Sequence, residues 1–139
     1  DPFWRRSLLE DKEREGLLSR VNLALLDLEA EVKGAFKVLR DRYSVRFPEL
    51  SALNLLPKQC AQVVLRIGAH LDVSSLDFSD ILPPYLTLAV KMHHASHKGR
   101  TLSQPELEAV LSIAGKVIEM INLRDDILQF IGDQMTLLV

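Results

Sequence analysis

The sequence is poor in cysteine, glycine and proline, and these shortages narrow the class of fold that it can adopt. Cys60 is the single cysteine, so a fold held together by internal disulfides is excluded. Only 6 glycines and 6 prolines occur in 139 residues, which favours an all-α fold because few segments are broken. No apolar run is long enough to span a bilayer, so we expect no membrane partner.

A basic excess is missing as well, since the formal net charge is -2 at pH 7. Proteins that bind nucleic acid over a whole surface use lysine and arginine to neutralise phosphates. Any contact with RNA is therefore expected to be local, or to come through a partner protein. The 47% of hydrophobic residues and 26% of charged residues are nevertheless typical of a chain that folds around a core.

A heptad pattern dominates the first third of the chain. After residues 1–18, which we interpret as a charged lead-in helix, residues 19–96 are expected to form a coiled-coil arm with a tip. Apolar residues recur at alternating steps of three and four, as in the seam of a coiled coil. These seam positions are Leu18, Val21, Leu25, Leu28, Val32, Ala35 and Leu39.

The seam needs an opposing helix, and the sequence offers two ways to supply one. A return helix is expected at about 82–96, with its apolar stripe packed on the arm. The stripe consists of Tyr85, Leu88, Ala89 and Met92. The alternative is a dimer of two chains that share the seam.

Proline and polar residues predict where helices begin and end. Pro48 should bend the chain after the arm, because proline disfavours the helical conformation in the residue before it. Residues 47–57 then form the tip, and a helix is expected over 58–71. Ser103 and Glu106 have the spacing of a capping box and open the next helix.

A second helix start is expected at Asn122 and Asp125, where a cap-forming residue is followed by an acid. The helices of residues 97–139 would then form a small base. The predicted fold is all-α: a long antiparallel helical hairpin, or coiled-coil arm, with a short helical tip and a small helical base.

Residue types that could carry catalysis or hold a metal are few. His93 and His97 are one helical turn apart, but no acidic or thiol ligand lies near them and His94 in the sequence. Cys60 belongs to an apolar helical face, where cysteines are usually structural. No glycine-rich phosphate loop or nucleophile elbow is present. We expect no catalytic residue, no metal, no cofactor and no small-molecule substrate, and hence no enzyme.

Two basic groups are candidate contacts to RNA or to a partner protein. One is the turn around Gly99, for which a solvated loop is the alternative, and the other lies at the end of the arm, where a protein contact fits as well as an RNA contact. The candidates are His97, Lys98 and Arg100 in the turn, and Arg40, Arg42 and Arg46 in the arm.

The region around Pro48 also resembles a known family. Arg42-Tyr43-Ser44 followed by Arg46-Phe47-Pro48-Glu49-Leu50 is similar to the arm signature of Nop-domain ribonucleoprotein proteins. Further matching residues follow in the family's order: Ile81-Leu82, Gly99, Leu102-Ser103, Glu106-Leu107-Glu108, Glu119, Ile127 and Met135. The splicing members are the most similar. The box C/D nucleolar members usually have a glycine and further aromatic or histidine residues in place of Ser44, Val45 and Arg46.

The resemblance implies a nuclear, structural component of the U4/U6 small nuclear ribonucleoprotein (snRNP) that helps to assemble the U4/U6·U5 tri-snRNP during pre-mRNA splicing. Its partners would be U4 RNA with its kink-turn-binding protein, and other tri-snRNP proteins. Residues 97–139 would be the first helices of a truncated Nop domain, with most RNA contacts beyond Val139. A box C/D nucleolar scaffold of the same family and an unrelated helical adaptor that dimerises through its coiled coil stay open as alternatives.

Overall fold

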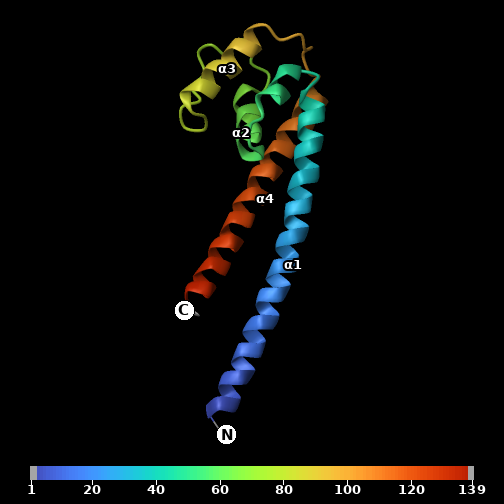
Figure 1. The fold of residues 1–139 in the computed structure, drawn as a ribbon. Coiled ribbons are helices and arrows are strands. Elements are labelled where there is room, and N and C mark those ends of the chain that lie inside the picture. The colour runs from blue at the N-terminus through green and yellow to red at the C-terminus, as the bar shows by residue number, and fades with distance from the viewer. Residues whose placement is uncertain (1–2, 138–139) are drawn as a thin grey trace. The chain divides into compact units, whose positions relative to one another are not determined.

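The computed structural model describes residues 3–137, and every regular element in them is a helix. This confirms the all-α fold class. The elements in chain order are α1 (Phe3–Tyr43), the 3-10 helix η1 (Pro48–Leu53), α2 (Pro57–Ile67), α3 (Pro84–Ala95) and α4 (Gln104–Leu137), as Figure 1 shows. None of the helices described is both long and apolar enough to cross a membrane.

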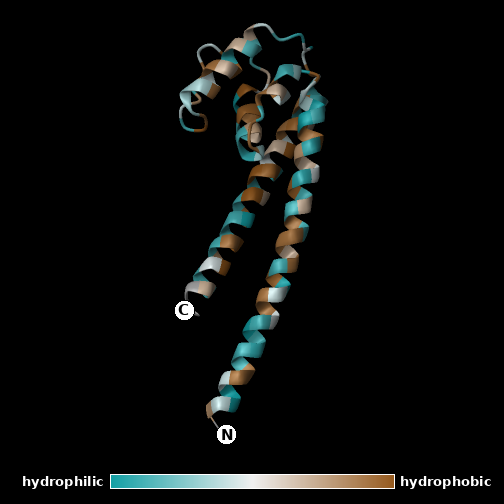
Figure 2. Ribbon diagram, viewed as in Figure 1, coloured by the Kyte–Doolittle hydropathy of each residue, from teal (hydrophilic) through white to brown (hydrophobic). Residues whose placement is uncertain are grey.

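The described chain divides into two compact units. Unit 1 contains α1 up to Glu31 and α4 from Asn122 onward, and unit 2 is Val32–Ile121. Hydrophobic and hydrophilic residues alternate along both long helices (Figure 2), as expected for helices with one buried face. The division into residues 1–18, 19–96 and 97–139 is a different one and stays a prediction.

The first helix joins the charged lead-in segment and the arm without a break. All seven seam residues are at least partly buried, and two of them, Val32 and Leu39, are buried almost completely at 5% and 0% exposure. The helix ends at Tyr43, and Pro48 then opens η1 in the first-turn position that needs no amide donor. Proline therefore acts where the sequence predicted, at the bend after the arm.

The return helix was assigned to the wrong face and the wrong segment. The exposed fractions of Tyr85, Leu88 and Met92 are 71%, 60% and 63%, whereas Val90 and His94 on α3 are buried. The helix packs against η1 instead. Its 12 residues span about 18 Å, too short to cover the seam of a 41-residue helix. Both compact units contain part of α1, and the 34-residue α4 also contributes residues to both of them.

Two predicted helix boundaries also differ from the structure. The expected start at Asn122 and Asp125 is wrong because α4 continues through both residues, and no glycine or proline lies there to break it. The helix expected over 58–71 is α2, which already ends at Ile67. Gly68 stops it with a φ of +50°, a conformation that glycine adopts with little strain.

Unit 2 has a single apolar core to which every one of its helices contributes. The Tyr43 hydroxyl donates a hydrogen bond to the Gly68 carbonyl at 3.2 Å, which ties the end of α1 to the end of α2. The residues of the core with exposed fractions no higher than 1% are Leu39, Tyr43, Phe47, Ala61, Val63, Val64, Ile67, Phe78, Val90, Val110, Ala114 and Val117. This core fixes the turn that carries the candidate site.

Candidate functional site

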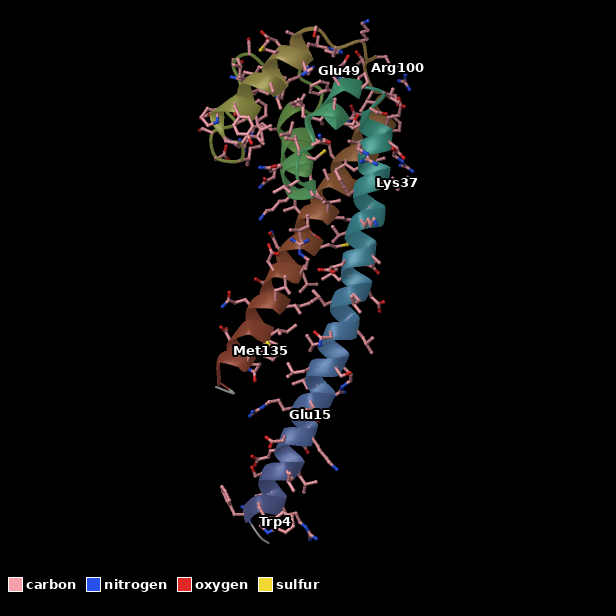
Figure 3. The ribbon with its side chains drawn as sticks, viewed as in Figure 1. Trp4, Glu15, Lys37, Glu49, Arg100 and Met135 are labelled. Atoms are coloured by element: carbon pink, nitrogen blue, oxygen red, sulfur yellow. The ribbon has the colours of Figure 1, made fainter. Side chains whose placement is uncertain are left out.

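The turn around Gly99 and the segment that follows α1 meet at one place in unit 2. The backbone N–H of Arg100 donates to the carbonyl of Val45 at 2.9 Å. Gly99 lies against the next peptide, so that a Cβ atom on it would be 2.1 Å from the Arg46 carbonyl oxygen. We call residues 45–49 together with 97–100 the clasp. Figure 3 shows Glu49 and Arg100, one from each half of it, at the same end of the unit.

Arg46 is the buried centre of the clasp. Its exposed fraction is 2%, and its guanidinium donates to the His70 carbonyl at 2.8 Å. The same group contacts Nε2 of His97 at 3.1 Å and Nε2 of His94 at 3.3 Å. The sequence grouped Arg46 with Arg40 and Arg42 as a candidate contact to RNA or a partner, and its burial was not expected. An arginine that contacts two imidazoles and a carbonyl in this way has a structural role, and we call Arg46 the pin of the turn.

The imidazole of His94 is kept neutral by its surroundings. Burial, then the charge of Arg46, then His97 lower the pKa of His94 to about 4. Because arginine can only donate, Nε2 of His94 must carry the lone pair and Nδ1 the proton. This ring and that of Phe47 also form a T-shaped pair, with ring centres 5.1 Å apart and an interplanar angle of 89°.

His97 is shared between the two halves of the clasp. Its Nε2 faces Arg46, while the backbone N–H of Gly99 donates to its Nδ1 at 3.2 Å. A neutral imidazole has one lone-pair nitrogen, so the two hydrogen bonds compete. With His94 and His97 both turned to Arg46, and His93 exposed, the three histidines do not converge on a common point.

Lys98 and Arg100 are both exposed, but only one has a free charge. The backbone N–H of Lys98 donates to Glu49 Oε1 at 3.0 Å, and the structure describes no ion pair for its exposed side chain. Arg100 makes two hydrogen bonds to the carboxylate of Glu106, at 2.9 and 3.1 Å. This pairing, followed by hydrogen bonds from Ser103, lowers the pKa of Glu106 to about 2.

The same carboxylate caps α4. The Ser103 backbone N–H donates to Glu106 Oε1 at 2.9 Å, and the Glu106 N–H donates to Ser103 Oγ at 3.3 Å. This reciprocal pair is the capping box that the sequence predicted. Arg100 is therefore engaged at a helix start, which no pattern in the sequence predicted.

The remaining two candidates lie on opposite sides of the end of α1. The guanidinium of Arg40 lies over the ring of Phe36, 5.5 Å from its centre. Arg42 is exposed and borders a hollow of about 390 Å³. The other lining residues of this hollow are Asp41, Val45, Glu106, Ala109 and Val110.

Cys60 has the chemistry of a core residue. Its thiol is buried, and burial raises its pKa to about 11, so it is protonated at neutral pH. Within residues 3–135, whose side chains the structure describes, no group of three metal-ligating side chains occurs. What the site offers is a rigid, charged surface on a pinned turn.

A helical chain with such a turn after the arm matches a known family over most of its length. Residues 24–139 match the family described as Nop, snoRNA binding domain, fibrillarin. The chain belongs to this family, whose members are structural RNA-binding proteins of ribonucleoprotein particles.

Individual relatives fall into two groups. The U4/U6 small nuclear ribonucleoprotein Prp31 homolog of Arabidopsis thaliana is 28% identical over 129 residues, which cover 93% of this chain and 27% of that protein. Nucleolar protein 58 is 26% identical in Schizosaccharomyces pombe and 29% in Coccidioides immitis, over 81% and 82% of this chain. The matches cover 22% and 19% of those two proteins. The chain thus spans about a quarter of these relatives or less.

Proposed function

We propose that this chain is the arm region of a pre-mRNA splicing factor in the nucleus. In this role it is a structural component of the U4/U6 snRNP and helps to assemble the U4/U6·U5 tri-snRNP. The full-length protein binds U4 RNA together with its kink-turn-binding protein, and the arm reaches other particle proteins. The observation that carries the proposal is the match to the Prp31 homolog over 93% of the chain, against about 80% for nucleolar protein 58.

The clasp supplies a second argument for the splicing branch. Ser44, Val45 and Arg46 stand where the box C/D members usually have glycine and further aromatic or histidine residues. Arg46 is not a free surface residue but the donor of three contacts inside the turn. A different residue at position 46 changes the side chain that holds the turn together. The splicing and box C/D members are therefore expected to build this turn differently.

The proposed role in RNA recognition is local. With a net charge of -2, the chain has little general attraction for phosphate. Lys98 is the free cation of the turn, and Arg42 is a second one near it, whereas Arg100 is already paired with Glu106. We therefore assign Lys98 the contact to the RNA and kink-turn protein, with Arg100 as a residue that shapes the turn.

The experiment is to identify the RNA that co-purifies with the tagged full-length protein from its own cells. U4 RNA is the expected result, and recovery of box C/D small nucleolar RNA would favour the nucleolar scaffold. Lys98→Glu should reduce recovery of U4 RNA, while Lys116→Glu is the matched control. Lys116 is an exposed lysine of α4 that takes no part in the clasp. Equal recovery with both variants would remove Lys98 from the interface.

The helical adaptor remains the alternative outside the family's known role. A dimer formed through the seam would have twice the mass of one chain in solution. Sedimentation equilibrium should give one chain, 15.7 kDa, at micromolar concentration. A mass of two chains would favour the adaptor.

A further inference from the structure

The part of α1 within unit 2 has a basic face that the proposed RNA contact does not use. Lys33, Lys37 and Arg40 are at positions i, i+4 and i+7, so they project on one side of the helix over about 10 Å. Figure 3 marks Lys37 on this part of α1. All three are exposed, and the ion pairs described in the structure use other cations, namely Arg66, Arg100 and Arg124.

Two carboxylates of α1 lie four residues from these lysines, Glu29 before Lys33 and Asp41 after Lys37. The structure describes no ion pair from either of them to this face, and Asp41 lines the hollow of Arg42 and Glu106. The basic face borders η1 and α2 instead, because Arg40 lines a different hollow with residues of those elements. Three positive charges are thus left without a negative partner in unit 2.

That second hollow lies directly beside the basic face. It has a volume of about 220 Å³ and a lining of mixed polarity, in which Phe36, Leu50, Leu55 and Cys60 are the apolar members. We call it the Phe36 hollow. Ser51 and Asn54 supply polar atoms at its edge, and Arg40 lies over the ring of Phe36 at its mouth. An apolar cavity on the order of 150 Å³ holds a benzene-sized group, so this space fits one aliphatic side chain.

We propose that the basic face and the Phe36 hollow together form a docking surface for a protein partner, an acidic helix that presents one aliphatic side chain. A partner helix with carboxylates at i, i+4 and i+7 matches the spacing of Lys33, Lys37 and Arg40, and a leucine between them reaches the hollow. The surface belongs to the arm and is independent of which RNA the full-length protein carries.

The chemistry of the hollow favours protein over RNA as the occupant. RNA phosphates would use the three cations but not the apolar side chains of the hollow. The ring of Phe36 is covered by Arg40, so the guanidinium of Arg40 is the one stacking plane that this surface offers a base. A helix satisfies both halves of the surface at once. RNA binding at the same place is therefore the rival outcome of the test.

The test uses the full-length protein and fluorescein-labelled helical peptides of about 16 residues, long enough to be partly helical alone. The first peptide has glutamate at i, i+4 and i+7 and leucine at i+3. In the second peptide serine replaces the leucine, and in the third glutamine replaces the glutamates. A single-stranded RNA of similar length is the fourth probe. Fluorescence anisotropy should show binding of the first peptide, with the second and third at least fivefold weaker.

Variants then separate the two halves of the surface. Lys33→Gln with Lys37→Gln should weaken binding about fivefold, and Lys12→Gln with Arg14→Gln, which makes the same charge change in unit 1, should leave it unchanged. Ser51→Phe should fill the hollow and abolish the preference for leucine over serine. Ala52→Phe is its control, because Ala52 is exposed next to Ser51 but does not line the hollow.

Each contrary result overturns the proposal in a distinct way. Failure of the first peptide to bind removes the docking surface. Equal binding of the leucine and serine peptides shows that the hollow has no role. Tighter binding of the RNA, lost in the lysine variant but retained in Ser51→Phe, shows a phosphate-binding face in place of a protein site. Equal loss in both pairs of charge variants shows that only overall charge matters.

Discussion

Adding a single methyl group at Gly99 tests the contact between the two halves of the clasp. A Cβ atom at this position would be 2.1 Å from the Arg46 carbonyl oxygen and 2.8 Å from that of Val45. Both obstacles are backbone atoms, which cannot move aside as the end of a flexible side chain can. Gly99→Ala must therefore either shift the backbone of residues 45–46 or lift the 97–100 turn off it.

The cost follows from what the turn holds. Lifting it breaks the hydrogen bonds from Arg100 N–H to Val45 and from Lys98 N–H to Glu49, each with a net contribution of about 1 kcal/mol. Keeping it in place instead strains the backbone by an amount typical of an overpacked site, about 1–3 kcal/mol. By either route Gly99→Ala should lower the free energy of unfolding by about 1–3 kcal/mol.

Urea unfolding followed by far-UV circular dichroism measures this loss. Gly115→Ala is the matched control, since Gly115 is inside α4 and a Cβ atom there meets nothing within 4 Å. The control should gain about 0.5–1 kcal/mol, because alanine is the better helix former. If Gly99→Ala is as stable as the unchanged chain, the close contact between the two halves of the clasp does not exist.

Four further predictions concern the pin, its histidine, the seam and RNA. Arg46→Ala should cost about 3–5 kcal/mol in urea unfolding, because it leaves a cavity and unpaired acceptors in a buried site. The folded pKa of His94 is about 4, below its usual 6.5. The contribution of His94 to stability should therefore be constant above pH 6.5 and fall by at most about 3 kcal/mol between pH 6.5 and 4. Urea midpoints across a pH series measure this change. In thermal melts Leu28→Glu should cost several kcal/mol and Leu39→Glu more, because Leu39 is the more deeply buried of the two seam residues. In gel shifts, residues 1–139 alone should bind kink-turn RNA poorly.

Local patterns in the sequence were sufficient for the features that depend on a few neighbouring residues. Pro48 predicted the bend, and Ser103 with Glu106 predicted the start of α4. In both cases the cause is steric or a hydrogen bond within one turn, so the sequence contains the whole argument. All seven seam positions of α1 are at least partly covered, and their pairing as a coiled coil stays a prediction.

Features that depend on distant residues could not be predicted in this way. The stripe of Tyr85, Leu88 and Met92 is as regular as a buried one, yet it is exposed because α3 uses its other side against η1. The sequence also does not show that parts of α4 share both compact units with parts of α1. The burial of Arg46 was also unforeseeable, since its acceptors are two imidazoles and a carbonyl from later segments and not an acid nearby in sequence.

The contacts that basic residues already make within the fold limit RNA binding by residues 1–139. Of the five candidate lysine and arginine residues, Arg46 is buried and Arg100 is bonded to Glu106, so the free positive charge of the site is smaller than the sequence suggested. The net charge of -2 adds no general attraction for phosphate. A gel-shift titration with a U4-type kink-turn RNA, with and without its kink-turn protein, should therefore show much tighter binding for the full-length protein than for residues 1–139. Lys98→Glu in the full-length protein should weaken that binding, most at low salt, while Lys116→Glu should not. Equally tight, salt-sensitive binding by residues 1–139 would place the RNA site within these helices, and the assignment of most RNA contacts to the rest of the protein would be wrong.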